Sequence, residues 1–530
     1  TRDWSSDVCS SDLGQESLQI LIVMVVYMAA VIGIGIFFAR RANADTEKFF
    51  LGGRSLGPWV SAMSAEASDM SGWLLMGLPG VAYWCGLADA FWTAAGLAVG
   101  TYINWLVVSK RLRRYSIAAN NAITLPEFFS NRFHEKKKVI MGISAAFILV
   151  FFTVYAASCL VTCGKLFSTL FGAPYITMML VGAAFVLIYT LLGGFLAESA
   201  SDFMQAIVMV VVLVAVLTLG VASAGGLNAV FENVKDFPGF LEFFGIADPV
   251  TEGGVQLAVN GVPSFGARQN YGALNVASML AWGLGYFGMP QVLLRFMAIR
   301  RENELRRARR VAMVWVVISL AAAILIGIVG RALFPTALTT ASEAENVFIY
   351  LSRSLLPAAL AGLAMAGILA ATISSSDSYL LIAASAFAKN AYQGIFKKNA
   401  TDKEVMTLSR IMLPVITAIA IVIALDENSV IFTIVSFAWA GFGATFGPLV
   451  LFSLFWKRMT RAGAIAGMLS GGGMVFIWKL VIKPLGGIFG IYELLPAFIV
   501  SGIFIIVVSL LTNAPSKEIQ DEFERVKKGA

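Results

Sequence analysis

The segment Ser64–Pro79 reads SAEASDMSGWLLMGLP, and it decides how the rest of the chain is interpreted. It places two acids, Glu66 and Asp69, inside a stretch that is otherwise apolar enough to cross a lipid bilayer. A charged side chain near the bilayer centre costs roughly 2.5–3.5 kcal/mol on insertion scales. The two acids must therefore face protein, water or a cation, and each marks a candidate functional site.

The same segment is rich in residues that weaken a helix. Hydroxyl side chains compete for backbone hydrogen bonds and glycine has poor helix propensity. The residues of these types here are Ser68, Ser71, Gly72 and Gly77. The sequence therefore predicts an unwound stretch, and non-helical backbone at membrane depth is tolerated only where protein or a cavity surrounds it.

The composition is that of a membrane protein with many helical spans. Of 530 residues, 58% are hydrophobic and 13% are charged, and the mean hydropathy is +0.80. The net charge of +7 comes from short basic clusters beside apolar runs. Such clusters are typical of cytoplasmic loops rather than of a nucleic-acid surface. We therefore predict an all-α polytopic membrane protein with no nucleic-acid partner.

The scarcity of histidine argues against an enzyme. His134 is the only histidine and lies in a charged loop, which leaves no histidine-based metal cluster or catalytic triad. Cys159 and Cys163 are spaced one helical turn apart in an apolar run and indicate packing rather than redox chemistry. We predict no enzymatic activity and no cofactor.

Apolar runs predict about thirteen transmembrane helices. The predicted spans are 17–38, 58–80, 88–108, 139–169, 175–193, 200–225, 272–297, 311–334, 353–388, 405–425, 431–455, 462–482 and 488–511. Residues 1–16 are set apart as a polar leader, of native or non-native origin, and 512–530 as a tail too short to form a domain.

The basic clusters predict the orientation of these spans. Lysine and arginine gather in loops that alternate along the chain, and such loops are cytoplasmic in bacterial inner membranes. We therefore expect a multi-pass protein of a bacterial-type plasma membrane. Its N-terminus would lie outside and its C-terminus in the cytoplasm. The hydrophilic stretch 226–271 would lie on the outer face.

A second site-like segment is 369–381, which reads LAATISSSDSYLL. Ser374, Ser375 and Asp377 are among its oxygen-bearing side chains, and hard cations prefer oxygen ligands. Small residues also permit close helix packing, with serines bonded back to carbonyls. The whole cluster with its acid favours a cation site over packing alone.

The third segment, 281–295, reads AWGLGYFGMPQVLLR, and its glycines and Pro290 predict a broken helix. A broken helix offers free N–H groups to a carboxylate and free carbonyls to a cation. Trp282 and Tyr286, one turn apart, would wall a small apolar substrate, although membrane aromatics also serve as packing anchors. Glu198 lies near a predicted membrane interface, and no site role is predicted for it.

Several motifs resemble the sodium:solute symporter family, and within it the proline-transporting members. They are LGGRSLGP (51–58), ASDMSGWLLMGLPG (67–80), NNAITLPEFF (120–129), GGFLA (193–197) and AWGLGYFGMP (281–290). The resemblance covers at least residues 45–390. It implies a leucine-transporter-like core of two inverted five-helix repeats, 58–225 and 272–455. Residues 17–38 would form an extra first helix and 462–511 two further ones.

The resemblance also implies a set of site residues. Sodium would be bound by the carbonyls of Ala67, Met70 and Ala371 and the hydroxyls of Ser374 and Ser375. Asp69 would support sodium binding, and Asp377 would form a second cation site. Proline would be bound by Ser71, Gly72, Trp73, Tyr155, Trp282, Tyr286 and Pro290, with Arg54 and Asp202 in gating or coupling.

The sequence departs from the family pattern at Glu66, Gln291 and Tyr379. The resemblance implies sodium-coupled uptake of L-proline by alternating access, with sodium and proline as partners and no obligate protein partner. Two alternatives stay open. One is a sodium symporter for another amino acid, pantothenate or a compatible solute, and the other is a transporter-like membrane sensor that binds its solute without accumulating it.

Overall fold

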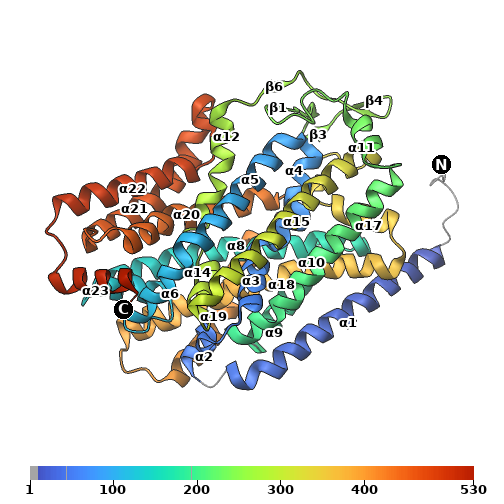
Figure 1. Ribbon diagram of the computed structural model, residues 1–530. Helices are drawn as coiled ribbons and strands as arrows, with labels where there is room; N and C mark the ends of the chain where they lie inside the picture. The colour runs from blue at the N-terminus through green and yellow to red at the C-terminus, as the bar shows by residue number, and fades with distance from the viewer. Residues whose placement is uncertain (1–9, 43–44, 193, 530) are drawn as a thin grey trace.

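Figure 1 shows the computed structural model of the chain, a bundle of long helices with short strands gathered at one end. The structure describes residues 10–42, 45–192 and 194–529. Residues 1–9 of the predicted leader lie outside the described residues. Helix α1 begins at Ser10, within that leader, and continues to Ala42.

The first half of the chain contains the helices from α1 to α11. Besides α1, they are α2 (Thr46–Leu51), η1 (Gly52–Arg54), α3 (Pro58–Gly72), η2 (Trp73–Gly77), α4 (Leu78–Cys85), α5 (Leu87–Ile103), η3 (Asn104–Val108), α6 (Ser109–Ala118), α7 (Leu125–Arg132), α8 (Val139–Phe171), α9 (Tyr175–Leu192), α10 (Phe195–Ser223) and α11 (Leu227–Val234).

The second half contains the remaining helices. They are α12 (Ala273–Leu280), α13 (Trp282–Gly285), α14 (Pro290–Ala298), η4 (Glu302–Glu304), α15 (Leu305–Leu333), α16 (Ala341–Ala344), α17 (Val347–Leu355), α18 (Ala358–Ser385), η5 (Ala386–Phe396), α19 (Asp402–Ile423), α20 (Ile431–Phe455), α21 (Arg461–Ile477), η6 (Trp478–Ile482), η7 (Lys483–Leu485), η8 (Gly487–Gly490), α22 (Leu494–Leu511) and α23 (Lys517–Lys528).

Ten helices of the described residues are long and apolar enough to cross a membrane. The other three predicted spans correspond to the interrupted helix α3–η2–α4, the shorter α9 and the interrupted helix α12–α13–α14. Because these three helices are interrupted or short, the count of thirteen membrane-spanning helices stays a prediction.

Two predicted spans have different boundaries in the structure. The span predicted at 353–388 covers parts of two helices, the end of α17 and most of α18. The helices are separate because Pro357 disfavours helical backbone at Leu356, so that α18 starts only at Ala358. The span predicted from residue 200 begins at Phe195 in α10. Glu198 and Asp202 therefore lie in the first two turns of a helix.

The hydrophilic stretch 226–271 forms small strands that the all-helical prediction did not include. They are β1 (Gly245–Ile246), β2 (Thr251–Glu252), β3 (Val255–Gln256), β4 (Ala258–Val259), β5 (Val262–Pro263) and β6 (Gln269–Asn270). They form three antiparallel pairs, β1 with β6, β2 with β3 and β4 with β5. Figure 1 shows them with α11 at the end of the bundle opposite α23.

Helix α3 lies at the centre of the packing. It contacts α10, α14, α15 and α18, and α18 in turn packs on α8, α10 and α1. Every side chain of α18 from Ala364 to Ser385 is buried. Acids and hydroxyls on α3 and α18 therefore face other helices rather than lipid. This arrangement brings the first two site-like segments of the sequence together.

Candidate functional site

Helix α3 is interrupted where the sequence predicted an unwound stretch. Ser71 has φ 50° and ψ −167°, far from helical values. The backbone N–H of Trp73 donates to the Ser71 hydroxyl oxygen at 3.2 Å, and the chain continues through the π-helical segment η2 into α4. The break therefore lies two residues after Asp69, and the prediction is confirmed.

Gly72 lets this break approach helix α8. A Cβ atom at Gly72 would lie 2.5 Å from both Cγ2 and Oγ1 of Thr162. No real Cβ contact is that short, so a larger residue would have to displace α8 or the break. Gly72 therefore has two effects at the break: it weakens the helix, and it leaves room for Thr162 of α8.

The second interrupted helix is also confirmed. Helix α13 ends at Gly285, and α14 begins at Pro290, whose missing N–H and fixed φ suit the first turn of a helix. Met289 between them is extended, with φ −76° and ψ 110°. A Cβ at Gly288 would lie 2.3 Å from the carbonyl oxygen of Phe442, so the break lies directly against α20.

The hydroxyls of α18 converge on the backbone of α3. Ser374 donates to the carbonyl of Ala67 at 2.9 Å and to that of Ala371 at 3.2 Å. Ser375 donates to the same Ala67 carbonyl at 3.2 Å. All of these residues are buried. Four of the five predicted sodium ligands therefore share one small region of neutral oxygens.

The fifth predicted ligand and the supporting acid lie beside this region. The carbonyl of Met70 accepts a hydrogen bond from the backbone of Trp73 rather than from α18. The carboxylate of Asp69 accepts from the Gln291 amide at 3.2 Å, which joins the two interrupted helices. Gln291 was noted in the sequence only as a departure from a pattern.

The hydroxyls of two tyrosines lie near the backbone carbonyl of Asp69. The hydroxyl of Tyr155 lies 3.5 Å and that of Tyr379 3.4 Å from the Asp69 carbonyl oxygen. Their rings stack with centroids 4.3 Å apart. Tyr155 was a predicted site residue, whereas no role was predicted for Tyr379.

The predicted aromatic walls come together at the two breaks. Trp73 and Trp282 have ring centroids 5.5 Å apart, and Phe432 of α20 lies within 6 Å of both. Trp439 donates its indole N–H to the Trp282 carbonyl at 2.8 Å and packs edge-on against Tyr286. The resulting aromatic cluster includes α20 residues that no local sequence motif singled out.

A buried ion-pair cluster lies on the side of α3 that faces α10. Arg295 of α14 pairs with Glu198 and Asp202 and donates to Ser64 at 3.0 Å and to Ser378 at 2.9 Å. Its side chain is fully buried. Glu198, for which the sequence predicted no site role, is therefore part of a buried cluster, because α10 already begins at Phe195.

Asp377 lies beside this cluster. Its Oδ1 accepts from the backbone N–H of Ser378 at 2.8 Å, and its Oδ2 has no hydrogen-bond partner. A small cavity where α9, α10 and α18 meet is lined by Tyr189, Thr190, Gly194, Glu198, Asp377 and Leu381. With Glu198 and Asp202, three carboxylates face the single guanidinium of Arg295.

Arg54 ties three elements together near the start of α3. Its guanidinium donates to Ser116 at 3.1 Å, to the Met297 carbonyl at 2.8 Å and to the Ala122 carbonyl at 2.8 Å. A further bond reaches Asn121 at 3.0 Å. The end of α14 is thus fastened to the end of α6 and the loop after it.

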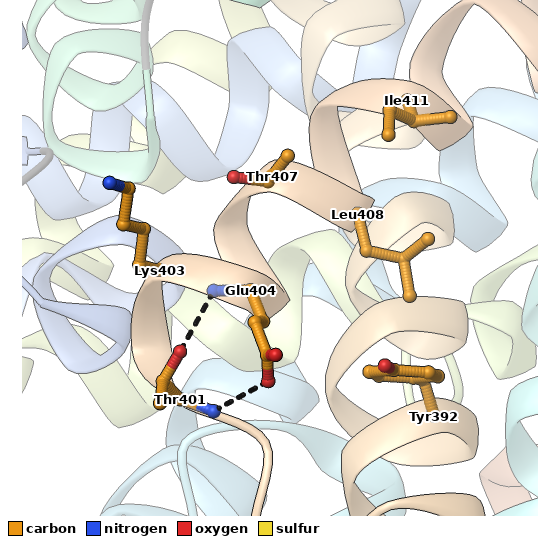
Figure 2. A pocket seen from close by; sticks show the side chains of 7 residues that line it. All are labelled: Tyr392, Thr401, Lys403, Glu404, Thr407, Leu408 and Ile411. Atoms are coloured by element: carbon orange, nitrogen blue, oxygen red, sulfur yellow. Dashed lines mark hydrogen bonds between the residues drawn. The ribbon is translucent and has the colours of Figure 1, made fainter.

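A groove of about 370 Å³ on the surface, shown in Figure 2, lies apart from these residues. It is lined by residues of η5 and α19 and the cap before α19. Thr401 and Glu404 in its wall form the capping box that starts α19, as the dashed lines indicate. The groove includes none of the predicted site residues.

Arg295 is the main residue that sequence reasoning missed. Its signal was present, because a basic residue inside an apolar helix is as costly as an acid and marks a site by the same argument. Phe432 and Trp439 had no such signal, since aromatics are common in membrane helices. Only the packing of α20 against both breaks shows their place.

Comparisons with known proteins identify the family of this chain. The model of the sodium:solute symporter family matches residues 49–471. The sodium/proline symporter of Haemophilus influenzae is 44% identical over 512 residues, which covers 96% of this chain and 97% of the relative. The sodium/proline symporter of Escherichia coli is 40% identical over 511 residues, with 96% of each covered.

A solved structure described as a substrate-bound, outward-open sodium-coupled sialic acid symporter matches with a TM-score of 0.75 at 16% identity. The match covers 94% of this chain and 99% of the other. It confirms the predicted fold class, a helical membrane protein with a leucine-transporter-like core. The chain belongs to the sodium:solute symporter family.

Proposed function

We propose that this protein takes up L-proline together with sodium by alternating access. The observation that carries the proposal is the convergence of the Ser374 and Ser375 hydroxyls on the Ala67 carbonyl, next to the break at Ser71. Relatives named as sodium/proline symporters match nearly the whole chain. The family assignment supports a transporter rather than an enzyme.

Sodium is bound where α18 meets α3. Its ligands are the carbonyls of Ala67, Met70 and Ala371 and the hydroxyls of Ser374 and Ser375. Neutral oxygens of this kind suit a hard monovalent cation. Asp69 supports the ion through its charge. Its hydrogen bond with Gln291 couples sodium binding to the position of α14.

Proline is bound between the two breaks. Trp73, Trp282 and Tyr286 form apolar walls for the pyrrolidine ring, and Tyr155 closes the side that faces α8. The breaks at Ser71 and Gly72 and before Pro290 leave helix ends in this region, where the carboxylate of a substrate is stabilised.

Asp377 forms a second cation site with Glu198 and Asp202. Three carboxylates against one guanidinium leave an excess of negative charge in a buried region. Because uncompensated buried charge is costly, a cation in the cavity beside Asp377 stabilises the cluster.

Arg54 and Asp202 act in gating and coupling. The bonds of Arg54 fasten the end of α14 to neighbouring loops, and those of Asp202 fasten α10 to Ser64 of α3. Opening the cavity toward the cytoplasm requires these contacts to change. Sodium drives that change only by binding one state more tightly than the other.

One sodium ion supplies enough free energy for uphill uptake. A membrane potential contributes about 2.3 kcal/mol per charge per 100 mV, and a tenfold sodium gradient adds about 1.4 kcal/mol. Together these support an accumulation of about several hundredfold.

The protein lies in a bacterial-type inner membrane with its N-terminus outside, its C-terminus in the cytoplasm and no obligate protein partner. Residues 58–225 and 272–455 form the two repeats, each of which begins with an interrupted helix. Residues 17–38 form an extra helix before the repeats. After them come two helices within 462–511 and a cytoplasmic tail at 512–530.

The first test is uptake of labelled proline into proteoliposomes under an inward sodium gradient. Wild-type protein should accumulate proline, and Asp69→Asn and Ser374→Ala should raise the sodium concentration for half-maximal uptake. A lost ligand to a charged ion costs about 1.5–3 kcal/mol, which corresponds to about tenfold to hundredfold weaker sodium binding.

Ser385→Ala is the matched control, because Ser385 lies on the same helix and bonds only to the Ile382 carbonyl. It should leave the sodium dependence unchanged. Accumulation of pantothenate, another amino acid or a compatible solute in place of proline would contradict the substrate proposal. Proline binding without accumulation would favour a sensor.

A further inference from the structure

Glu66 of α3 has no part in the sodium site or the proline site, although it lies near Tyr286 and Asp69, which belong to them. Glu66 and Asp69 lie three residues apart on α3 and therefore share one face of the helix. Their exposed fractions are 1% and 3%. The buried ion pairs of the described bundle centre involve Glu198, Asp202 and Glu345, and neither of these two acids.

Glu66 has too few hydrogen-bond partners for a buried carboxylate. The indole N–H of Trp105 donates to its Oε1 at 3.2 Å. Its Oε2 has no partner. A buried carboxylate needs several donors or a cation to offset the loss of hydration, and a single indole N–H does not meet that need.

Neighbouring side chains leave further oxygens without partners. Asn104 of η3 donates its amide to the Tyr286 carbonyl at 2.9 Å, which fixes its orientation and leaves Oδ1 without a partner. Oγ1 of Thr101 and the Tyr286 hydroxyl also have none. The Tyr286 hydroxyl lies near both carboxylates and Thr101 but forms no hydrogen bond of ordinary geometry with any of them. All three side chains are almost completely buried.

These atoms form a set of oxygens from three parts of the fold, α3, α5–η3 and the break before α14. Native proteins pair nearly all buried polar atoms, so a group of unpaired oxygens around an acid indicates a ligand. Oxygen-only ligands with one carboxylate suit a hard monovalent cation.

We propose that Glu66, Thr101, Asn104 and Tyr286 bind a sodium ion of their own, separate from the ion at Ser374. The proposal rests on sodium-coupled transport as proposed above. One ion at each place balances the two carboxylates of α3, which have no basic partner among the residues that the structure describes. Because Tyr286 lies at the break of the second interrupted helix, this ion holds both interrupted helices in one arrangement.

The test is to count ²²Na⁺ bound by the purified full chain in detergent. Glu66→Gln and Thr101→Val should each bind one sodium ion fewer than the wild type. In proteoliposomes both should lower the Hill coefficient for sodium in proline uptake. Ser374→Ala, which alters the other site, should lose a different ion, so Glu66→Gln combined with Ser374→Ala should lose two.

Thr93→Val is the matched control. Thr93 is buried on the same helix α5, two turns before Thr101, and its hydroxyl contacts only the Met279 sulfur. It should bind as much sodium as the wild type. Unchanged melting temperatures would show that lost binding is not lost folding.

Wild-type sodium binding in both Glu66→Gln and Thr101→Val would overturn the proposed ion while leaving the Ser374 site intact. If Ser374→Ala alone removed all bound sodium, the separate site would also be refuted. A wild-type chain that bound no sodium would instead refute the symport proposal on which this one rests.

Discussion

At the residue scale, glycines set how closely the interrupted helices approach their neighbours. No side chain would fit at Gly72 or Gly288, because its Cβ atom would collide with Thr162 or with the Phe442 carbonyl. These contacts place two backbone breaks against α8 and α20. Tyr155 and Trp439, on those two helices, can then reach the same region.

Gly72→Ala should therefore impair uptake more than an ordinary glycine substitution. Its Cβ would lie 2.5 Å from Thr162, and overpacking of this kind costs about 1–3 kcal/mol. We expect the initial rate of proline uptake to fall by about tenfold, which corresponds to about 1.4 kcal/mol. The measurement is uptake in proteoliposomes at equal protein content.

A companion change tests the cause. Thr162→Ala removes the two nearest atoms that a Cβ at Gly72 would meet, and it should restore part of the rate when combined with Gly72→Ala. Gly473→Ala is the control, because nothing lies within 4 Å of a Cβ there. A rate for Gly72→Ala equal to that of Gly473→Ala would show that the contact does not matter.

At the scale of elements, one buried arginine holds three helices. Arg295 of α14 pairs with two acids of α10 and bonds to Ser378 of α18. Removal of one partner from a buried ion-pair cluster costs about 3–5 kcal/mol, because the remaining charges stay buried without compensation. The cluster therefore joins α14 to the helices around it.

Arg295→Met should lower the melting temperature of the purified protein strongly, and the added change Glu198→Gln should recover part of the loss. The recovery is expected because it removes one of the uncompensated charges. Arg300→Met serves as the control, since Arg300 is exposed and pairs only with Glu304, and exposed pairs contribute about 0–1 kcal/mol. Equal melting temperatures for Arg295→Met and Arg300→Met would refute this role.

At the scale of the whole molecule, charge and loops are distributed unequally between the two ends. The strand-bearing loop 226–271 lies at one end, and α23 lies at the other, with its acids against His134 and Lys457. The proposed orientation puts the strands outside and α23 in the cytoplasm, in agreement with the preference of basic loops for the cytoplasm.

Cysteine labelling checks that orientation in intact cells. In a background with Cys9→Ser and Cys85→Ser, Val259→Cys in the exposed strand β4 should react with a membrane-impermeant maleimide. Asp521→Cys on an exposed face of α23 should react only after the membrane is permeabilised. The reverse pattern would show that the protein has the opposite topology.

The breaks in α3 and before α14 were predictable because glycine, proline and hydroxyl residues act on the backbone locally. The Ser374 cluster was predictable because acids and hydroxyls are costly in an apolar helix wherever that helix lies. The pairing of Glu198 with Arg295 was not, since it depends on α10 starting at Phe195 and on α14 packing against it.

The sequence by itself determined that this chain is a helical membrane protein, where two of its helices break and which residue types lie at the breaks. Apolarity, helix propensity and the cost of buried charge are properties of short segments. Only the tertiary structure decided which oxygens share a region and which acids have a basic partner. It also decided that, within the described part of the chain, Glu66 and Asp69 have none. Those facts depend on contacts between residues hundreds of positions apart, which packing of α3, α14 and α18 alone brings together.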